Sequence, residues 1–173
     1  LTALLAVAEG LSPGRAVLVV AAVLAGQLSI GWCNDLVDLA RDRTVGRSDK
    51  PLASGAISRS VVRRACGAAL GATVVLSLAC GPLAGGLHLA LVAMGWLYNL
   101  RLKATVWSWL PYAVAFGGLP VFVALAAPDP TLPQAWLPVA AALLGVGAHV
   151  VNVLPDLADD AATGVRGLPH RLG

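Results

Sequence analysis

The sequence predicts an all-α membrane protein built as a multi-helix transmembrane bundle. Hydrophobic residues make up 58% of the 173-residue chain and charged residues only 12%, whereas soluble domains carry about 25% charged residues. The mean hydropathy is +0.79. Several apolar stretches reach the roughly 20 residues that a helix needs to cross the hydrocarbon core. The net charge of +3 comes without a basic stripe interleaved with aromatic residues, so we expect the lipid bilayer as a partner and no nucleic acid.

The first helices are set by apolar runs and by the breaks between them. Residues 1–8 are apolar up to a Glu-Gly pair and are predicted to form the tail of a first helix. Residues 15–40 are long enough to span the membrane and run into an acidic cluster, which we expect in the last turns of this helix. Residues 43–58 contain glycine and proline among polar residues and are predicted to form a loop.

Two more helices follow this loop. Residues 59–80 form a third predicted helix, for which Ser58 is a suitable N-cap. A Gly-Pro turn separates it from a fourth predicted helix at residues 83–100. Residues 101–103 are a short basic connector.

The last two predicted helices contain prolines. Residues 104–126 form the fifth and residues 134–158 the sixth, which has Pro155 inside it. A proline frees a backbone carbonyl, and a membrane helix tolerates this only where another group satisfies that carbonyl. Residues 161–173 are predicted to form a polar loop. The chain therefore holds about six helices of membrane type.

One spacing of polar residues ends two of these helices. It occurs at Asn34, Asp38 and Asp42, and again at Asn152, Asp156 and Asp160. On a helix, residues four apart share one face, with neighbours about 6 Å apart. Carboxylates at this spacing suit a shared divalent cation, which relieves their mutual repulsion. Ionisable residues in membrane helices are costly, so the repeated pattern indicates a functional site.

With these motifs the chain resembles the UbiA superfamily of intramembrane prenyltransferases. The stretch from Asn34 to Gly55 is similar to the family's first aspartate-rich motif with its trailing basic-Pro-Leu-x-x-Gly segment, and Asp156 to Asp160 is similar to the second. The segment from Tyr98 to Lys103 is similar to the family's Tyr/Lys loop. The resemblance implies a bundle of about nine membrane-crossing helices. We therefore expect residues 1–173 to be a single transmembrane prenyltransferase domain that is incomplete at both ends.

The resemblance also implies the chemistry. An allylic prenyl diphosphate ionises with the help of Mg²⁺, pyrophosphate leaves, and an acceptor attacks the prenyl cation. The predicted metal-binding residues are Asp38, Asp42, Asp156 and Asp160. The predicted diphosphate-binding residues are Asn34, Arg47, Lys50, Arg101, Asn152 and Arg166. Tyr98 and Lys103 are the predicted catalytic residues, and Arg101 competes with Lys103 for its role.

Charge predicts the orientation of the bundle. If the helices alternate in direction, the loops at 41–64, 101–103 and 161–173 fall on one side and hold every Lys and Arg except Arg15. The positive-inside rule makes that side cytoplasmic. Both acidic motifs arrive there, so we expect the active site at the cytoplasmic face of a bacterial cell membrane.

Other functions share parts of the pattern. A membrane terpene cyclase on the same scaffold would use the same ionisation chemistry. A transporter with paired acidic sites is a different class, but it would place its carboxylates near the bilayer midplane and not at helix ends. The sequence selects neither the acceptor nor the prenyl chain length. His88 and His149 lie inside apolar helices and are interpreted as packed side chains.

Overall fold

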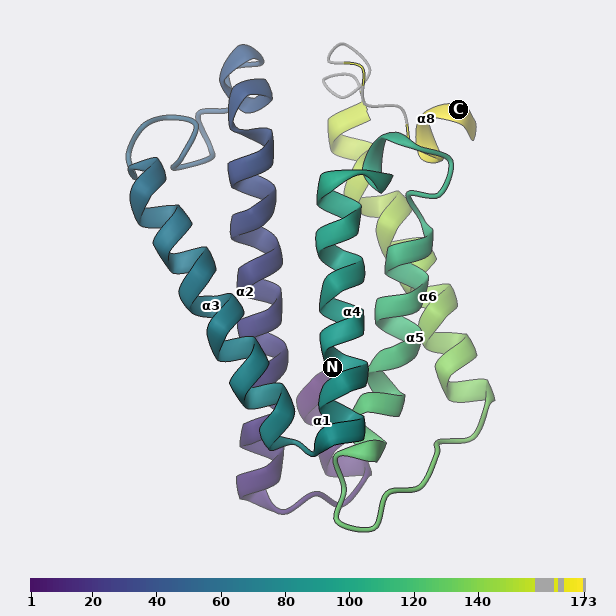
Figure 1. Ribbon diagram of the computed structural model, residues 1–173. Coiled ribbons are helices and arrows are strands. Elements are labelled where there is room, and N and C mark those ends of the chain that lie inside the picture. Colours follow the sequence, from purple (N-terminus) through teal and green to yellow (C-terminus); the bar gives the residue numbers. More distant parts are fainter. Residues whose placement is uncertain (158–163, 165–166, 173) are drawn as a thin grey trace.

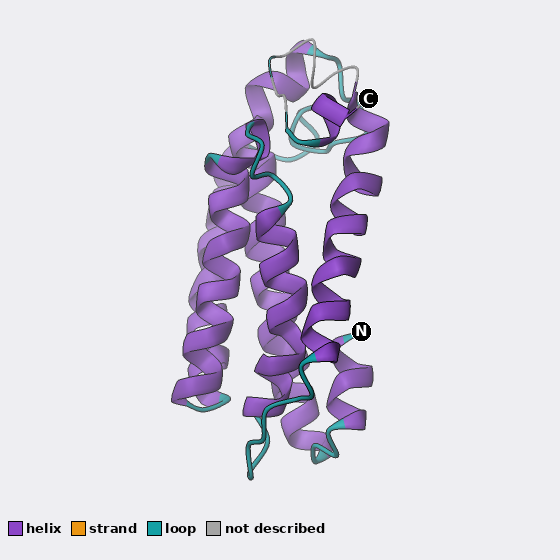
Figure 2. Ribbon diagram, turned by 90° about the vertical axis from the view of Figure 1, so that its right-hand side faces the viewer, coloured by secondary structure: helices purple, strands orange, loops and turns teal. Residues whose placement is uncertain are grey.

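The computed structural model describes residues 1–157, 164 and 167–172, and this part of the chain contains helices and no strand. The α-helices are α1 (Thr2–Ala8), α2 (Pro13–Thr44), α3 (Arg59–Ala79), α4 (Pro82–Leu100), α5 (Leu110–Leu125), α6 (Trp136–Val153) and α8 (Pro169–Leu172). Two short 3₁₀ helices are η1 (Leu102–Ala104) and η2 (Leu154–Asp156). Figures 1 and 2 show an elongated bundle whose long helices run along one common direction. The predicted all-α bundle is confirmed.

The outside of the bundle is suited to lipid. Helices α2, α3, α4 and α6 are long and apolar enough to cross a membrane, whereas α5 has 16 residues. Large apolar side chains point outward along them, and Val75 and Leu143 are 67% and 68% exposed. Lipid tails are as apolar as these side chains, so this surface is stable in a bilayer. The protein is therefore an integral membrane protein.

The longest helix, α2, carries the first acidic motif. Its 32 residues extend about 48 Å at 1.5 Å per residue, which exceeds the hydrocarbon thickness of about 30 Å. Pro13 begins the helix in its first turn, where a missing amide proton costs no helical hydrogen bond. The acidic motif occupies the last turns, as predicted. Ser58 then caps α3 by accepting a hydrogen bond from the Val61 amide at 3.4 Å.

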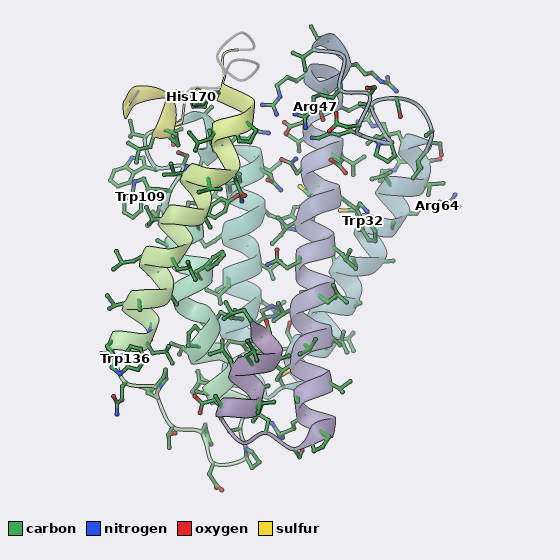
Figure 3. The ribbon with its side chains drawn as sticks, turned by 180° about the vertical axis from the view of Figure 1, so that it is seen from behind. Trp32, Arg47, Arg64, Trp109, Trp136 and His170 are labelled. Carbon is green, nitrogen blue, oxygen red and sulfur yellow. The ribbon has the colours of Figure 1, made fainter. Side chains whose placement is uncertain are left out.

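The two ends of the bundle differ. The α2–α3 loop, η1 and α8 lie at one end, which is the upper end in Figure 1. Figure 3 shows Arg47, Trp109 and His170 toward this end and Trp136 toward the other.

A buried apolar cluster that includes Phe122 packs α1, α2, α4 and α5 together. Helix α5 packs along α6, where a Cβ at Gly145 would lie 2.8 Å from the Cβ of Phe116. This glycine therefore permits the close approach of the two helices.

The fifth helix begins later than the sequence predicted. The expected helix was 104–126, but α5 starts at Leu110, and residues 105–109 form turns. Thr105 Oγ1 accepts the amide of Trp107 at 3.2 Å, and Ser108 Oγ accepts the amide of Leu168 at 2.9 Å. Such side-chain hydrogen bonds compete with those of a helix. The segment therefore stays irregular.

The sixth helix ends earlier than predicted. The α-helical part stops at Val153, and η2 follows with Pro155 inside it. Proline has no amide proton and its ring clashes with the preceding turn, so it ends the α-helix. The second acidic motif begins at Asn152 on α6 and continues to Asp156 in η2, instead of lying on one α-helix. The predicted loop at 161–173 includes the short helix α8.

Candidate active site

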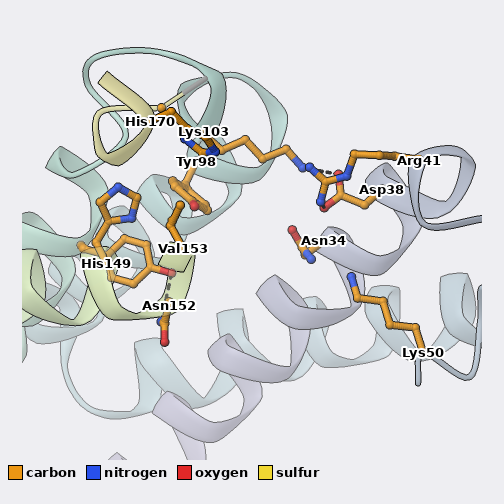
Figure 4. Close-up of a pocket in the computed structure, with 12 residues that line it drawn as sticks. Asn34, Asp38, Arg41, Lys50, Tyr98, Lys103, His149, Asn152, Val153 and His170 are labelled. Atoms are coloured by element: carbon orange, nitrogen blue, oxygen red, sulfur yellow. Dashed lines mark hydrogen bonds and ion pairs between the residues drawn. The ribbon is translucent and has the colours of Figure 1, made fainter. Parts of the chain in front are cut away.

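A polar cavity of about 170 Å³ lies at the charged end of the bundle. It brings together parts of the chain that are distant in sequence, as Figure 4 shows. The lining residues are Asn34, Asp38, Arg41, Lys50, Tyr98, Lys103, Tyr112, His149, Asn152, Val153, Gly167 and His170. Residues of both acidic motifs and of the Tyr98–Lys103 segment therefore share one cavity.

Asp38 lies in the wall of this cavity and is only 5% exposed. Arg41, on the next turn of α2, donates from Nη2 to Asp38 Oδ2 at 3.2 Å. Lys103 reaches across from η1 and forms an ion pair with the other carboxylate oxygen. A buried charge without such partners would cost several kcal/mol. The pair with Lys103 therefore links η1 to the first motif.

Asp42 follows one turn later and is 2% exposed. Lys50 Nζ lies 2.8 Å from Asp42 Oδ2 and 3.6 Å from Asp35 Oδ1. The α2–α3 loop that carries Lys50 folds back onto the helix, where the Arg47 amide donates to the Asp42 carbonyl at 2.9 Å. Lys50 also lines the cavity, so the loop supplies a cation to it.

Two of the predicted diphosphate-binding residues, Arg47 and Arg101, do not line this cavity. Arg47 donates from Nε and Nη2 to the two carboxylate oxygens of Asp49 at 2.9 and 3.0 Å. This hydrogen bond from Arg47 lowers the pKa of Asp49. Arg101 is exposed and is not among the cavity residues. Among the lysines and arginines that were predicted to act at the site and that the structure describes, Lys50 and Lys103 line the cavity.

Two tyrosines form an aromatic wall between the motifs. Tyr98 on α4 meets Tyr112 on α5 edge to face, with ring centroids 5.3 Å apart. The Tyr112 hydroxyl accepts a hydrogen bond from Asn152 Nδ2 at 3.5 Å. The sequence analysis did not single out Tyr112. Its sequence signal is a side chain with a hydroxyl group in an otherwise apolar predicted helix.

The second motif is described only in part. Asn152 lines the cavity, and the backbone of Asp156 lies in η2. Asp160 and Arg166, together with Asp159, lie outside the described residues. Their predicted roles remain predictions.

His149 is buried, as interpreted from the sequence, but it also belongs to the cavity wall. It is 1% exposed and lies on α6 one turn before Asn152. Its Nε2 is 3.0 Å from Ser108 Oγ. Its ring centroid is 4.9 Å from that of Tyr112 and 5.9 Å from that of Tyr98. The three-residue spacing to Asn152, which puts both on one helix face, was the sequence signal for this position.

The donor set fits Mg²⁺. Asp38 and Asp42 are buried carboxylates one turn apart. Asp38 and Asn34 line the polar cavity, whereas Asp42 lines a neighbouring cavity against the α2–α3 loop. Mg²⁺ usually takes one or two carboxylates and completes its coordination with waters and substrate phosphates. The described residues contain no group of three or more His, Cys, Asp or Glu side chains that could hold a metal ion. The basic partners of the two aspartates also suit phosphate oxygens.

Two larger cavities continue from the polar one into the apolar interior. The first, of about 390 Å³, shares with the polar cavity the residues Asn34, Tyr98, Tyr112 and Asn152. The second, of about 320 Å³, shares with the first the residues Gln27, Ile30, Gly95, Ala115 and Phe116. The cavities therefore form a series from the charged end of the bundle toward its apolar core.

Fold and site together define an integral-membrane helical protein with a carboxylate-containing polar cavity at one end of an apolar bundle. The model of the UbiA prenyltransferase family matches residues 1–173. The chain belongs to the UbiA prenyltransferase family, as the motifs predicted.

Solved structures agree on the fold. The apo structure of a UbiA homologue from Aeropyrum pernix K1 superposes with a TM-score of 0.81 at 22% identity, covering 99% of this chain and 67% of the homologue. A structure of digeranylgeranylglyceryl phosphate synthase superposes with a TM-score of 0.73 at 19% identity, covering 98% of this chain and 63% of the synthase. This chain thus spans about two thirds of the length of each. No curated protein sequence matches it significantly.

Proposed function

We propose that the protein is a prenyltransferase that moves a prenyl group from an allylic prenyl diphosphate to an acceptor, with Mg²⁺-dependent release of pyrophosphate. The observation that carries this proposal is the series of cavities. A polar compartment that contains the buried Asp38 and the cations of Lys50 and Lys103 adjoins two larger, more apolar compartments of about 390 and 320 Å³. A molecule with a highly charged head and a hydrocarbon tail matches both parts.

The first motif supplies metal ligands in this proposal. Asp38 and Asp42 hold Mg²⁺ from α2, and Asp156 and Asp160 are the corresponding ligands of the second motif. Bound Mg²⁺ neutralises the repulsion between carboxylates and diphosphate and stabilises the charge of the leaving pyrophosphate. Asn34 and Asn152 contribute neutral contacts to the metal or to phosphate oxygens.

The chain's cations and tyrosine act on the substrate directly. Lys50 and Lys103 already line the cavity, so they bind phosphate oxygens by charge-assisted hydrogen bonds. Tyr98 lines both the polar and the adjoining apolar cavity, which places its ring where head and tail of the substrate meet. An electron-rich ring at that point stabilises the prenyl cation. Arg47 joins the site when its loop folds over the diphosphate, and Arg166 is a further proposed diphosphate-binding residue.

The orientation completes the proposal. The polar cavity lies at the end of the bundle that holds the basic loops. The positive-inside rule assigns this end to the cytoplasm, where a water-soluble diphosphate head is available. We propose that the protein lies in a bacterial cell membrane with this end toward the cytoplasm.

The test is a pyrophosphate assay with the purified intact protein, expressed from the intact gene, in lipid nanodiscs with farnesyl diphosphate as donor. We expect release that EDTA abolishes and Mg²⁺ restores. Mass spectrometry of lipids from cells with and without the intact gene then identifies the prenylated product. A cyclic hydrocarbon formed without an acceptor would favour the terpene cyclase alternative. Absence of pyrophosphate release from farnesyl diphosphate and from shorter and longer allylic diphosphates would contradict both enzyme functions.

A further inference from the structure

His149 is a buried residue in the wall of the polar cavity. Figure 4 shows it beside Tyr98 and on the opposite side of the cavity from Asp38 and Arg41. Its ring contacts Tyr98 and Tyr112, and both tyrosines also line the adjoining apolar cavity. His149 itself lines only the polar cavity, so it lies on the side of the charged head, next to the two tyrosines that border both cavities. In an allylic diphosphate the border between these cavities corresponds to the bond between the first prenyl carbon and its oxygen.

The partners of Ser108 favour one tautomer of His149. Ser108 Oγ accepts the amide proton of Leu168 at 2.9 Å and lies 3.0 Å from His149 Nε2. The Leu168 amide, the Ser108 hydroxyl and His149 Nε2 all have a hydrogen-bond partner when Ser108 donates its hydroxyl proton to Nε2. An Nε2 that accepts a hydrogen bond is unprotonated, so the single proton of the neutral imidazole is on Nδ1.

The Nδ1 donor is the unsatisfied group in this arrangement. It is buried and has no hydrogen-bond partner among the residues that the structure describes. Buried donors are nearly always paired, and an orphan beside a binding cavity points to a ligand atom as its partner. The rigid support from Ser108 and from two aromatic rings holds this donor in a fixed orientation before substrate binds.

Building on the proposed function, we propose that His149 is a catalytic hydrogen-bond donor that stabilises the leaving diphosphate. During ionisation the bond between the first prenyl carbon and the diphosphate oxygen breaks, and its electron pair stays on that oxygen. The Nδ1–H of His149 donates to this oxygen, or to a neighbouring oxygen of the same phosphate, while its negative charge grows. The proton stays on His149, and the prenyl cation is then captured by the acceptor. A preorganised donor of this kind typically contributes about 10²–10³ in rate.

Three substitutions separate this role from a structural one. The side-chain amide of asparagine places a donor near the position of Nδ1, whereas that of glutamine reaches the position of Nε2 and keeps the contact with Ser108. Phenylalanine keeps the ring volume and has no donor. The full chain in nanodiscs is tested with farnesyl diphosphate and Mg²⁺ for single-turnover pyrophosphate release. The non-ionising analogue farnesyl thiodiphosphate is used for binding.

We expect His149→Gln and His149→Phe to slow pyrophosphate release by about 10²–10³, with a much smaller effect on thiodiphosphate binding, because the contact strengthens only as the bond breaks. His149→Asn should retain most of the wild-type rate. Fast release by the Gln variant and slow release by the Asn variant would show that His149 acts through Ser108, and would overturn the proposal.

Other results also decide the question. Wild-type rates in all three variants, or equal losses of folded protein in all three by size-exclusion chromatography, would assign His149 a packing role only. A wild-type protein that binds farnesyl thiodiphosphate with Mg²⁺, together with an unimpaired Gln variant, overturns this inference but not the proposed function. A wild-type protein that neither binds the analogue nor releases pyrophosphate overturns both.

Discussion

Lys103 and Arg101 are two residues apart in one connector, yet their surroundings differ. Lys103 lines the cavity and pairs with Asp38, whereas Arg101 is exposed. We expect Lys103→Met to lower pyrophosphate release by about 10²–10³, because it removes a charged contact to the diphosphate. Arg101→Met is the matched control and should retain most of the activity. Steady-state rates of pyrophosphate release from farnesyl diphosphate measure both variants. A larger loss in Arg101→Met than in Lys103→Met would assign the contact with the diphosphate to Arg101.

The residues of the site were predictable to the extent that they follow a local pattern. Asp38 and Asp42 were found because four-residue spacing on a helix is visible in sequence, and the two carboxylates do lie buried on α2. Ser108 and His149 were not predicted as partners because 41 residues separate them. Such a contact depends on how the turn before α5 packs against α6, and no short sequence pattern encodes it.

Among the elements, the contact between α5 and α6 gives a test of packing. A Cβ at Gly145 would lie 2.5 Å from the Tyr112 carbonyl oxygen, whereas a Cβ at Gly147 would meet nothing within 4 Å. We expect Gly145→Ala to destabilise the protein by about 1–3 kcal/mol through overpacking. Gly147→Ala should be neutral or slightly stabilising, because alanine is favoured over glycine in a helix. Thermal unfolding in detergent measures the difference, and equal effects would contradict the close packing of α5 on α6.

Helix ends show what local sequence signals can and cannot specify. Apolar runs predicted α3 and α4 to within one residue at each end, because a Ser N-cap and a Gly-Pro turn mark their limits. The start of α5 was placed too early because residues 104–109 are largely apolar and contain no break. The hydrogen bonds that Thr105 accepts from Trp107 and that Ser108 accepts from the distant Leu168 determine its conformation instead. The early end of α6 had a visible cause in Pro155, whose effect was underestimated.

For the whole molecule, the basic loops predict one orientation in the membrane. Ser48 in the α2–α3 loop and Asp129 in the α5–α6 loop are both exposed and lie at opposite ends of the bundle. The native cysteines, Cys33, Cys66 and Cys80, are buried and should give little background. With a membrane-impermeant thiol reagent on intact bacterial cells, Asp129→Cys should be labelled and Ser48→Cys should not. Strong labelling at position 48 alone would reverse the orientation.

The central claim is that buried carboxylates of the first motif act through Mg²⁺ on an allylic diphosphate. The most direct measurement is the rate of pyrophosphate release from farnesyl diphosphate as a function of Mg²⁺ concentration, for Asp38→Asn, Asp42→Asn and the control Asp49→Asn. Asp49 is exposed and pairs with Arg47 outside the cavity, so its variant should follow the wild-type curve. The variants at 38 and 42 should need more Mg²⁺ and lose about 10²–10³ in rate at limiting Mg²⁺. Full activity of Asp38→Asn and Asp42→Asn at limiting Mg²⁺ would contradict the claim.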